Sequence, residues 1–183
     1  MMPIVIPKIF TKKQCENIIS YHSNWLENIG SIGKKKIINP NERQCLTYIP
    51  PSIEYIPNWL STEIYKIIFF VNEESYNYDL NETNLQLHIL RYDLGGHYKA
   101  HIDIGADRTA KTIFNRKLSF SLYLNDSYEG GNLRFFGLDG MFKNLGVGDI
   151  LIFPSYLVHM VEPVTSGVRW VLVGWILGNK HFR

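Results

Sequence analysis

Cysteine is scarce in this chain, with two residues, Cys15 and Cys45, among 183. Two cysteines cannot form the several cross-links that hold small secreted proteins together. The chain is also long enough to bury an apolar core without such help. We therefore expect both thiols to stay reduced and the protein to be cytoplasmic.

The chain also has no large excess of charge of either sign, since 19 basic residues face 17 acidic ones. The formal net charge is +2, which is too small to indicate a nucleic-acid partner. The run Lys34-Lys35-Lys36 is basic, but short charged runs are more often solvated loops than binding patches. On charge, the sequence argues against nucleic acid as a partner.

Long hydrophobic runs are missing too. The run from Trp170 to Leu177 is among the longest, whereas a helix that spans a bilayer needs about 20 apolar residues. The start of the chain lacks the basic and apolar regions of a signal peptide. We expect one domain over residues 1–183, without membrane contact and with no indication of oligomeric state.

Two amphipathic helices are expected in the first 80 residues. The first covers about Thr11–Asn28, because Thr11 and Gln14 match the capping box and apolar residues follow at helical spacing. The second covers about Pro57–Glu74, with proline in its first turn. Between them, Ser31–Pro51 is polar, basic and rich in turn residues, which predicts a long loop.

After Asn81 the sequence changes to short β-rich segments separated by Gly, Asp and Asn. Many short strands at close spacing are typical of a sandwich or barrel. The predicted class is mainly β with flanking helices (α+β). A double-stranded β-helix, or jelly roll, would occupy about residues 81–180, with the helical segment of about residues 1–80 packed on one sheet. The expected strands are Leu85–Tyr92, His97–Asp103, Arg116–Asn125, Asn132–Phe136, Asp149–Phe153, Val158–Val161 and Val168–Leu177, with Pro3–Phe10 as a further edge-strand candidate.

The triplet His101-Ile102-Asp103 ends one of these strands. Residues i and i+2 of a strand share a face, so an imidazole and a carboxylate would lie side by side. A histidine, x, aspartate triplet alone is a weak signal. A further histidine, His159, begins another expected strand, and remote strands become neighbours in a jelly roll.

Two histidines and one carboxylate form the facial triad of non-haem Fe(II) oxygenases. Three protein ligands on one side leave three metal positions open for a chelating co-substrate and O2. A lone histidine is more often structural. Taken together, His101, Asp103 and His159 predict a catalytic metal site.

A basic residue, Arg169, follows the last of these candidate metal ligands in the sequence. Arg169 lies ten residues after His159, at the start of the apolar run Val168–Leu177. A buried arginine is costly unless it meets an anion, and its planar fork suits a carboxylate. Without the metal ligands, a surface arginine on an edge strand would be an equally good interpretation.

This pattern resembles the Fe(II)- and 2-oxoglutarate-dependent dioxygenases, most closely the prolyl 4-hydroxylase-like group. The family's ordered motif is matched by His101, Asp103, His159 and Arg169. Likeness covers about Leu85 to Gly178. Further segments similar to the family are Tyr128–Leu133, Gly146–Asp149, Ile152–Ser155 and Glu162–Thr165.

The resemblance assigns roles to three more residues. Tyr123 falls where prolyl hydroxylases place a tyrosine on the distal 2-oxoglutarate carboxylate, and Tyr92 matches another pocket tyrosine. Trp175 sits where related hydroxylases carry a tryptophan against the metal site. The implied cofactors are Fe(II), 2-oxoglutarate as co-substrate and O2, and ascorbate is a further candidate.

The resemblance implies a hydroxylase that couples oxidative decarboxylation of 2-oxoglutarate to substrate hydroxylation. The loops Ser31–Pro51 and Ile104–Asn115 would flank the pocket, as loops that clamp peptides do in prolyl hydroxylases. We therefore expect a peptidyl-proline substrate, as in procollagen-proline 4-dioxygenases. A hydroxylase of free amino acids or other small molecules and a non-catalytic jelly-roll binding module remain alternatives. A nucleic-acid demethylase of the same superfamily is disfavoured. The resemblance implies a second arginine six residues after the first in such enzymes, and this chain has Trp175 at that position.

Overall fold

The computed structural model describes residues 1–31, 37–104, 114–138, 142, 145–179 and 182. Two α-helices precede a region that is almost entirely β. The prediction of a mainly β chain with two helices is therefore confirmed. In chain order the elements are β1 (Ile4–Ile6), α1 (Lys12–Ser20), η1 (Tyr21–Asn24), β2 (Leu26–Ile29), β3 (Arg43–Gln44), β4 (Leu46–Ile49), η2 (Ile53–Tyr55), α2 (Asn58–Val71), η3 (Asn72–Tyr76), β5 (Leu80–Tyr92), β6 (His97–His101), β7 (Phe114–Tyr123), β8 (Tyr128–Gly130), β9 (Leu133–Phe135), β10 (Ile150–Pro154), β11 (His159–Val161), β12 (Val164–Gly167) and β13 (Arg169–Asn179).

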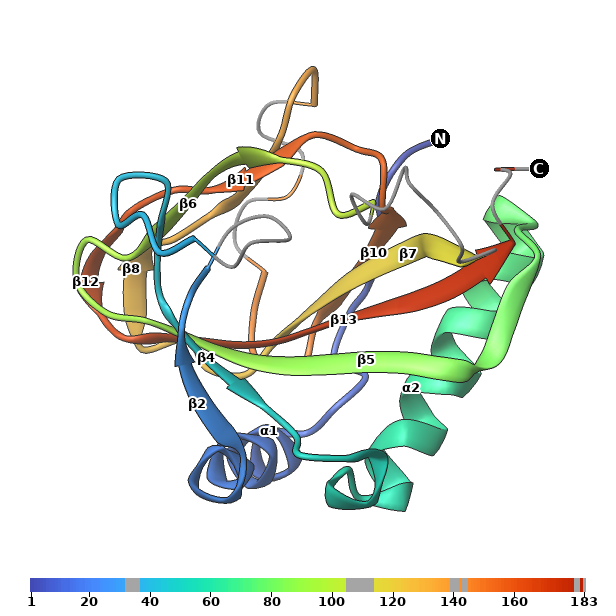
Figure 1. The fold of residues 1–183 in the computed structure, drawn as a ribbon, viewed down its shortest axis with the longest axis horizontal. Coiled ribbons are helices and arrows are strands. Elements are labelled where there is room, and N and C mark those ends of the chain that lie inside the picture. The colour runs from blue at the N-terminus through green and yellow to red at the C-terminus, as the bar shows by residue number, and fades with distance from the viewer. Residues whose placement is uncertain (32–36, 105–113, 139–141, 143–144, 180–181, 183) are drawn as a thin grey trace.

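The strands form two main sheets. A seven-stranded sheet has the order β1-β10-β7-β13-β5-β4-β2, and a four-stranded sheet has the order β3-β6-β11-β9. Strands β8 and β12 form a separate antiparallel pair. Figure 1 shows β6 and β11 on one side of the large sheet and both α-helices on the other side.

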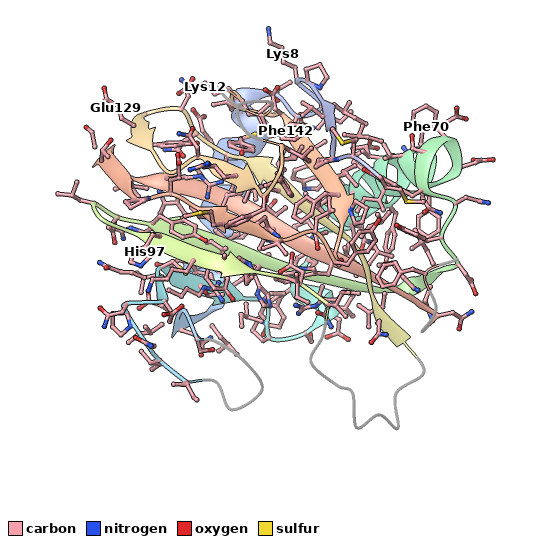
Figure 2. The ribbon with its side chains drawn as sticks, turned by 90° about the horizontal axis from the view of Figure 1, so that it is seen from above. Lys8, Lys12, Phe70, His97, Glu129 and Phe142 are labelled. Atoms are coloured by element: carbon pink, nitrogen blue, oxygen red, sulfur yellow. The ribbon has the colours of Figure 1, made fainter. Side chains whose placement is uncertain are left out.

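Alternation along the strands divides the interior into two apolar clusters. On β5, Leu87 and Ile89 belong to the cluster that includes α1 and α2, whereas Leu90 and Tyr92 belong to the cluster shared with the small sheet. This is the period of two that a strand buried on both faces must satisfy. Charged side chains such as Lys8, Lys12 and Glu129 project outward at the surface (Figure 2).

The first helix begins as predicted but ends early. The Thr11 side chain caps Gln14 N, and the Gln14 side chain accepts the Thr11 backbone N–H, which completes the capping box. The prediction of helix to about Asn28 was wrong, because α1 ends at Ser20 and Leu26–Ile29 forms β2. That segment pairs antiparallel with β4, so pairing with a distant strand prevails over the local helical spacing.

The expected loop Ser31–Pro51 is also corrected in part. Residues 32–36 lie outside the described residues, but the remainder contains β3 and β4. Strand β4 joins the large sheet through β5, and β3 joins the small sheet through β6. The segment therefore bridges the two sheets. The loop expected at Ile104–Asn115 lies mostly outside the described residues.

The remaining expectations agree with the structure. Helix α2 covers most of the second predicted helix and continues into a short π-helical turn, η3. All seven expected strands after Asn81 are present within a few residues, and β1 lies inside the expected edge strand. Among the described residues, none of the helices has the length and apolar character needed to cross a membrane.

Candidate active site

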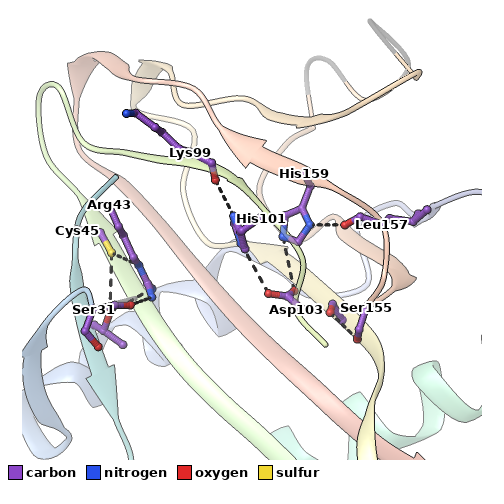
Figure 3. Close-up of polar contacts among 11 residues, drawn as sticks. Ser31, Arg43, Cys45, Lys99, His101, Asp103, Ser155, Leu157 and His159 are labelled. Atoms are coloured by element: carbon purple, nitrogen blue, oxygen red, sulfur yellow. Dashed lines mark hydrogen bonds and ion pairs between the residues drawn. The ribbon is translucent and has the colours of Figure 1, made fainter. Parts of the chain in front are cut away.

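Strand pairing places two histidines side by side. His159, the first residue of β11, lies opposite His101, the last residue of β6. Their ring centroids are 4.2 Å apart. Figure 3 shows both imidazoles directed at the same carboxylate, that of Asp103.

Asp103 completes the cluster from just beyond the strand. Its carboxylate lies 3.7 Å from Nε2 of His101 and 3.6 Å from Nε2 of His159. Strand β6 ends at His101, and the Asp103 backbone N–H donates instead to the carbonyl of Ser155 at 2.9 Å. The side chains of His101 and Asp103 therefore lie close together, as expected. Asp103 lies beyond the end of β6, however, so the two residues do not share one face of a strand. One donor atom from each residue lies within 4.8 Å of the others, a spacing that suits one metal ion.

The backbone fixes which ring nitrogens face the cluster. Nδ1 of His101 lies 2.7 Å from the carbonyl of Lys99, and Nδ1 of His159 lies 2.9 Å from the carbonyl of Leu157 (Figure 3). A carbonyl only accepts, so each Nδ1 carries the proton and each Nε2 keeps its lone pair. Such bonds set the tautomer of metal-binding histidines.

The protonation states also suit a cation. Burial and the adjacent His159 lower the pKa of His101 to about 4, so this ring is neutral at neutral pH. Burial opposes ionisation of Asp103, but the two imidazoles outweigh it and lower the pKa of the carboxyl. His101 thus presents a neutral imidazole beside the carboxylate of Asp103.

Arg169 lies deep in the same interior. It is 1% exposed, and its backbone pairs in register with Tyr92 on β5. Its guanidinium carbon lies 5.3 Å from the ring centroid of Tyr92 and 5.2 Å from that of Tyr123. Burial raises the pKa of both tyrosines, so their hydroxyls stay neutral. The burial of Arg169 excludes the interpretation as a surface arginine. Among the described residues no carboxylate pairs with Arg169, so its buried charge is available to bind an anion.

A glycine makes room for this arginine. Gly131 has φ of +61°, and a Cβ at this position would lie 2.8 Å from Cδ of Arg169. The left-handed backbone and the close approach both require glycine. Gly131 therefore helps to decide where the guanidinium lies.

Two buried hydrogen-bond donors lie in the site. Nε of Arg169 and Nε1 of Trp175 are buried without a hydrogen-bond partner among the described residues. A buried unsatisfied donor costs about 1–3 kcal/mol, and such groups are most easily explained by a ligand. All seven residues singled out from the sequence except Tyr123 line one cavity of about 870 Å³, and Tyr123 contacts Arg169 at its wall.

Several residues of the cavity were not found from the sequence. Tyr98 stacks on His101 with ring centroids 3.5 Å apart, and the guanidinium carbon of Arg43 lies 4.6 Å from the centroid of the Tyr98 ring. Arg43 was expected in the loop that flanks the pocket, but its place on β3 and its contact with Tyr98 were not predicted. His88 and Gln86 could have been found from the sequence. They lie four and six residues before Tyr92 in an expected strand, so strand alternation places all three side chains on the same face.

Sequence comparison identifies the family to which this site belongs. A family profile described as the 2OG-Fe(II) oxygenase superfamily matches residues 87–177. A PKHD-type hydroxylase of Aliarcobacter butzleri is 30% identical over 188 residues, covering 96% of this chain and 78% of the relative. The chain therefore belongs to the 2OG-Fe(II) oxygenase superfamily, and its relatives include PKHD-type hydroxylases. One of these, from Synechococcus, is 42% identical over 91 residues, covering 48% of this chain and only 39% of the relative.

Solved structures show the same fold. A prolyl 4-hydroxylase from Pseudomonas putida superposes with a TM-score of 0.72 at 19% identity, covering 98% of this chain and 93% of the neighbour. A prolyl hydroxylase from Trichoplax adhaerens, solved with a hypoxia inducible factor peptide fragment, gives 0.75 at 17% identity, covering 96% and 83%. Membership makes the chain an oxidoreductase of the dioxygenase type and implies Fe(II), 2-oxoglutarate and O2 as its cofactors.

Proposed function

We propose that this chain is an Fe(II)- and 2-oxoglutarate-dependent hydroxylase of the prolyl 4-hydroxylase type that acts on peptidyl proline. Residues 1–183 would form one oxygenase domain, with its two sheets arranged as a double-stranded β-helix against two N-terminal helices. The observation that carries the proposal is the shared cavity. It holds a two-histidine, one-carboxylate donor set and a buried arginine without a counter-ion among the described residues.

The metal would be held by Nε2 of His101, Nε2 of His159 and the carboxylate of Asp103. The donor set fits Fe(II), because imidazole and carboxylate are its usual protein ligands. When bound, the iron supplies the activation of O2 that no side chain can provide. The protein orients both imidazoles through backbone carbonyls, and the side chains of the three donor residues are 16%, 12% and 5% exposed for His101, Asp103 and His159.

The co-substrate would be anchored by Arg169. A bidentate contact to the distal carboxylate of 2-oxoglutarate would satisfy its unpaired Nε and compensate its charge. Neutral Tyr123 and Tyr92, whose rings both lie close to the guanidinium, can each donate a hydrogen bond to the same carboxylate. Trp175 presents its indole N–H in the same cavity, beside the carboxylate of Asp103, and this donor helps to lower the pKa of that carboxyl.

The peptide assignment draws on the neighbours and on the size of the cavity. The described residues nearest to both expected mouth loops, such as Ser31 and Ile104, line the cavity. Its volume of about 870 Å³ leaves room for a second molecule beside 2-oxoglutarate. Ascorbate as a reductant and a cytoplasmic location, which suits the free thiols of Cys15 and Cys45, belong to the same proposal.

The test combines product analysis with binding. Protein with Fe(II), 2-oxoglutarate and ascorbate is incubated with proline-rich peptides, and succinate and peptide mass are measured, with His159→Ala as the blank. We expect succinate together with peptide that has gained one oxygen atom on proline. Succinate without modified peptide would redirect the search to a free amino acid or another small molecule. Failure of Mn(II) and 2-oxoglutarate to bind in a coupled way, measured by calorimetry, would instead leave a non-catalytic binding module.

A further inference from the structure

The cavity has a second set of cations beyond the co-substrate anchor. Arg116, at the start of β7, lies with its guanidinium carbon 3.8 Å from the centroid of the Trp175 ring. Its Nε and Nη2 both donate to Oε1 of Gln86, at 3.1 and 2.8 Å. These three side chains belong to three paired strands of the large sheet, so the guanidinium is held in place before any ligand arrives.

Arg43 reaches the same cavity from β3. It donates to three neutral acceptors, which are Sγ of Cys45 at 3.2 Å, the carbonyl of Ser31 at 3.1 Å and the hydroxyl of Thr47 at 3.4 Å. Its guanidinium also lies over the ring of Tyr98. These contacts fix the position of the cation without neutralising it.

Neither arginine has a carboxylate partner among the described residues. Basic side chains elsewhere in the described chain do pair with carboxylates, as the following distances show: Arg91 with Asp93 at 2.8 Å, Lys66 with Glu63 at 2.8 Å, Lys99 with Glu42 at 3.0 Å and Arg134 with Glu162 at 3.2 Å. None of these four pairs lines the cavity, so carboxylate partners that are present elsewhere in the described chain are not placed beside Arg43 or Arg116.

The carboxylates that line the described part of the cavity do not offset these charges. They are Asp103, which belongs to the metal donor set, and Glu27, which is exposed on the edge strand β2. With Fe(II) and the dianion 2-oxoglutarate both bound, their charges cancel, and Asp103 offsets Arg169. Arg43 and Arg116 remain as the excess positive charge inside a partly enclosed space.

The pKa of His88 is affected by both arginines. Burial and then the two guanidinium groups, Arg116 and Arg43, lower the pKa of His88 to about 3. The imidazole is therefore neutral and can act as a hydrogen-bond donor or acceptor between two cations. Burial lowers the pKa of Arg116, and Asp103, which lines the same cavity, acts in the opposite direction.

We propose that Arg43 and Arg116 form an anion-binding site for the substrate, so that the molecule oxidised carries a carboxylate next to its reacting residue. This inference rests on the proposed function and narrows it. A neutral proline in a neutral peptide would leave both cations desolvated and unpaired, whereas a carboxylate would meet a preformed, doubly basic site. The carboxylate can come from an acidic side chain, from a peptide C-terminus or from a free amino acid.

The experiment uses three matched pairs that differ only in one carboxylate. They are acetyl-Ala-Ala-Pro-Glu-Ala-amide against the Gln peptide, acetyl-Ala-Ala-Pro acid against its amide, and L-proline against L-prolinamide. The full chain is loaded with Mn(II) and 2-oxoglutarate without O2, and dissociation constants are measured by calorimetry at low and high salt. The pair with the largest preference identifies the source of the carboxylate.

We expect the acidic member of at least one pair to bind roughly tenfold tighter or more, with a preference that shrinks as salt rises. Arg116→Gln and Arg43→Gln should each reduce that preference, Arg116→Lys should retain part of it, and Lys66→Gln on the helical face should leave it unchanged. Equal affinities within all three pairs would overturn the inference, as would a preference that survives both glutamine variants.

Binding by none of the six compounds would also overturn it, together with proline as the target. The proposed oxygenase function is judged separately, by 2-oxoglutarate binding to the Mn(II) protein and its loss in Arg169→Gln. The two proposals can therefore fail independently.

Discussion

His159 and His101 lie directly opposite each other in the antiparallel pair β11 and β6, and each ring presents Nε2 to Asp103. The two Nδ1 atoms are held by carbonyls two residues earlier in each chain segment, those of Leu157 and Lys99. The donor set is therefore organised by backbone pairing between remote segments of the chain. Such organisation predicts tight and specific metal binding.

Replacement of His159 by alanine tests the donor set. We expect the affinity for Mn(II) to fall by at least about 100-fold, because loss of an outer partner alone typically costs 10–100-fold. Calorimetric titration of the metal measures it, with His97→Ala as the matched control. His97 donates from Nδ1 to the carbonyl of Gly95 and is the first residue of β6, labelled in Figure 2. Equal losses in both variants would contradict the assignment.

Replacement of Arg169 tests the co-substrate anchor. Removing one partner of a buried charge pair costs about 2–5 kcal/mol, so Arg169→Gln should raise the KM for 2-oxoglutarate by roughly 30-fold or more. Arg169→Lys should lie between, because lysine keeps the charge but loses the fork. Arg91→Gln is the control, since Arg91 pairs with Asp93 and lies on the other face of β5. An unchanged KM in Arg169→Gln would remove the anchor.

Gly131 offers a second route to the same anchor. Gly131→Ala places a Cβ against Cδ of Arg169 and should raise the KM for 2-oxoglutarate. Gly137→Ala is a close control, because Gly137 also has positive φ, +80°, but nothing within 4 Å of the added Cβ. Both variants should lose about 1–2 kcal/mol of unfolding free energy from the left-handed backbone. If both raise the KM equally, the contact with Arg169 is not the cause.

The buried neutral His88 predicts a dependence of stability on pH. Its pKa is about 3 in the folded protein, below the usual value near 6.5. Between these values the unfolded chain binds a proton that the folded protein does not, so stability falls as pH falls below about 6.5. His88→Asn and His88→Leu should both flatten the slope of unfolding free energy between pH 6.5 and 4, measured by denaturant titration of the metal-free protein. A slope as steep as in the unmodified protein would rule out this contribution.

The capping box of α1 predicts a local stability effect. Thr11→Ala removes the side-chain cap of Gln14 N and should lower the unfolding free energy by about 1 kcal/mol. Thr62→Ala, at an exposed position inside α2, is the matched substitution and should cause no loss, since alanine is the better helix former. Thermal or denaturant unfolding measures both. A loss in Thr62→Ala as large as in Thr11→Ala would argue against the cap.

Parts of the fold could be predicted because their signals are local. The alternation in β7 and the apolar composition of β13 indicate strands whatever their partners are, and the capping box marks the start of α1. The end of α1 could not be predicted in this way. The segment Leu26–Ile29 continues a helical pattern, and only its pairing with β4 decides that it forms a strand.

The sequence by itself determined which groups are available for chemistry, because His101, Asp103, His159 and Arg169 supply two imidazoles, a carboxylate and a guanidinium in a fixed order. Only the tertiary structure decided what surrounds that chemistry. Arg43 enters the cavity through the pairing of β3 with β6, and Arg116 is held there by Gln86 and Trp175 from neighbouring strands. The physical reason is that ligand identity is a property of single side chains, whereas uncompensated charge is a property of the space that remote strands enclose.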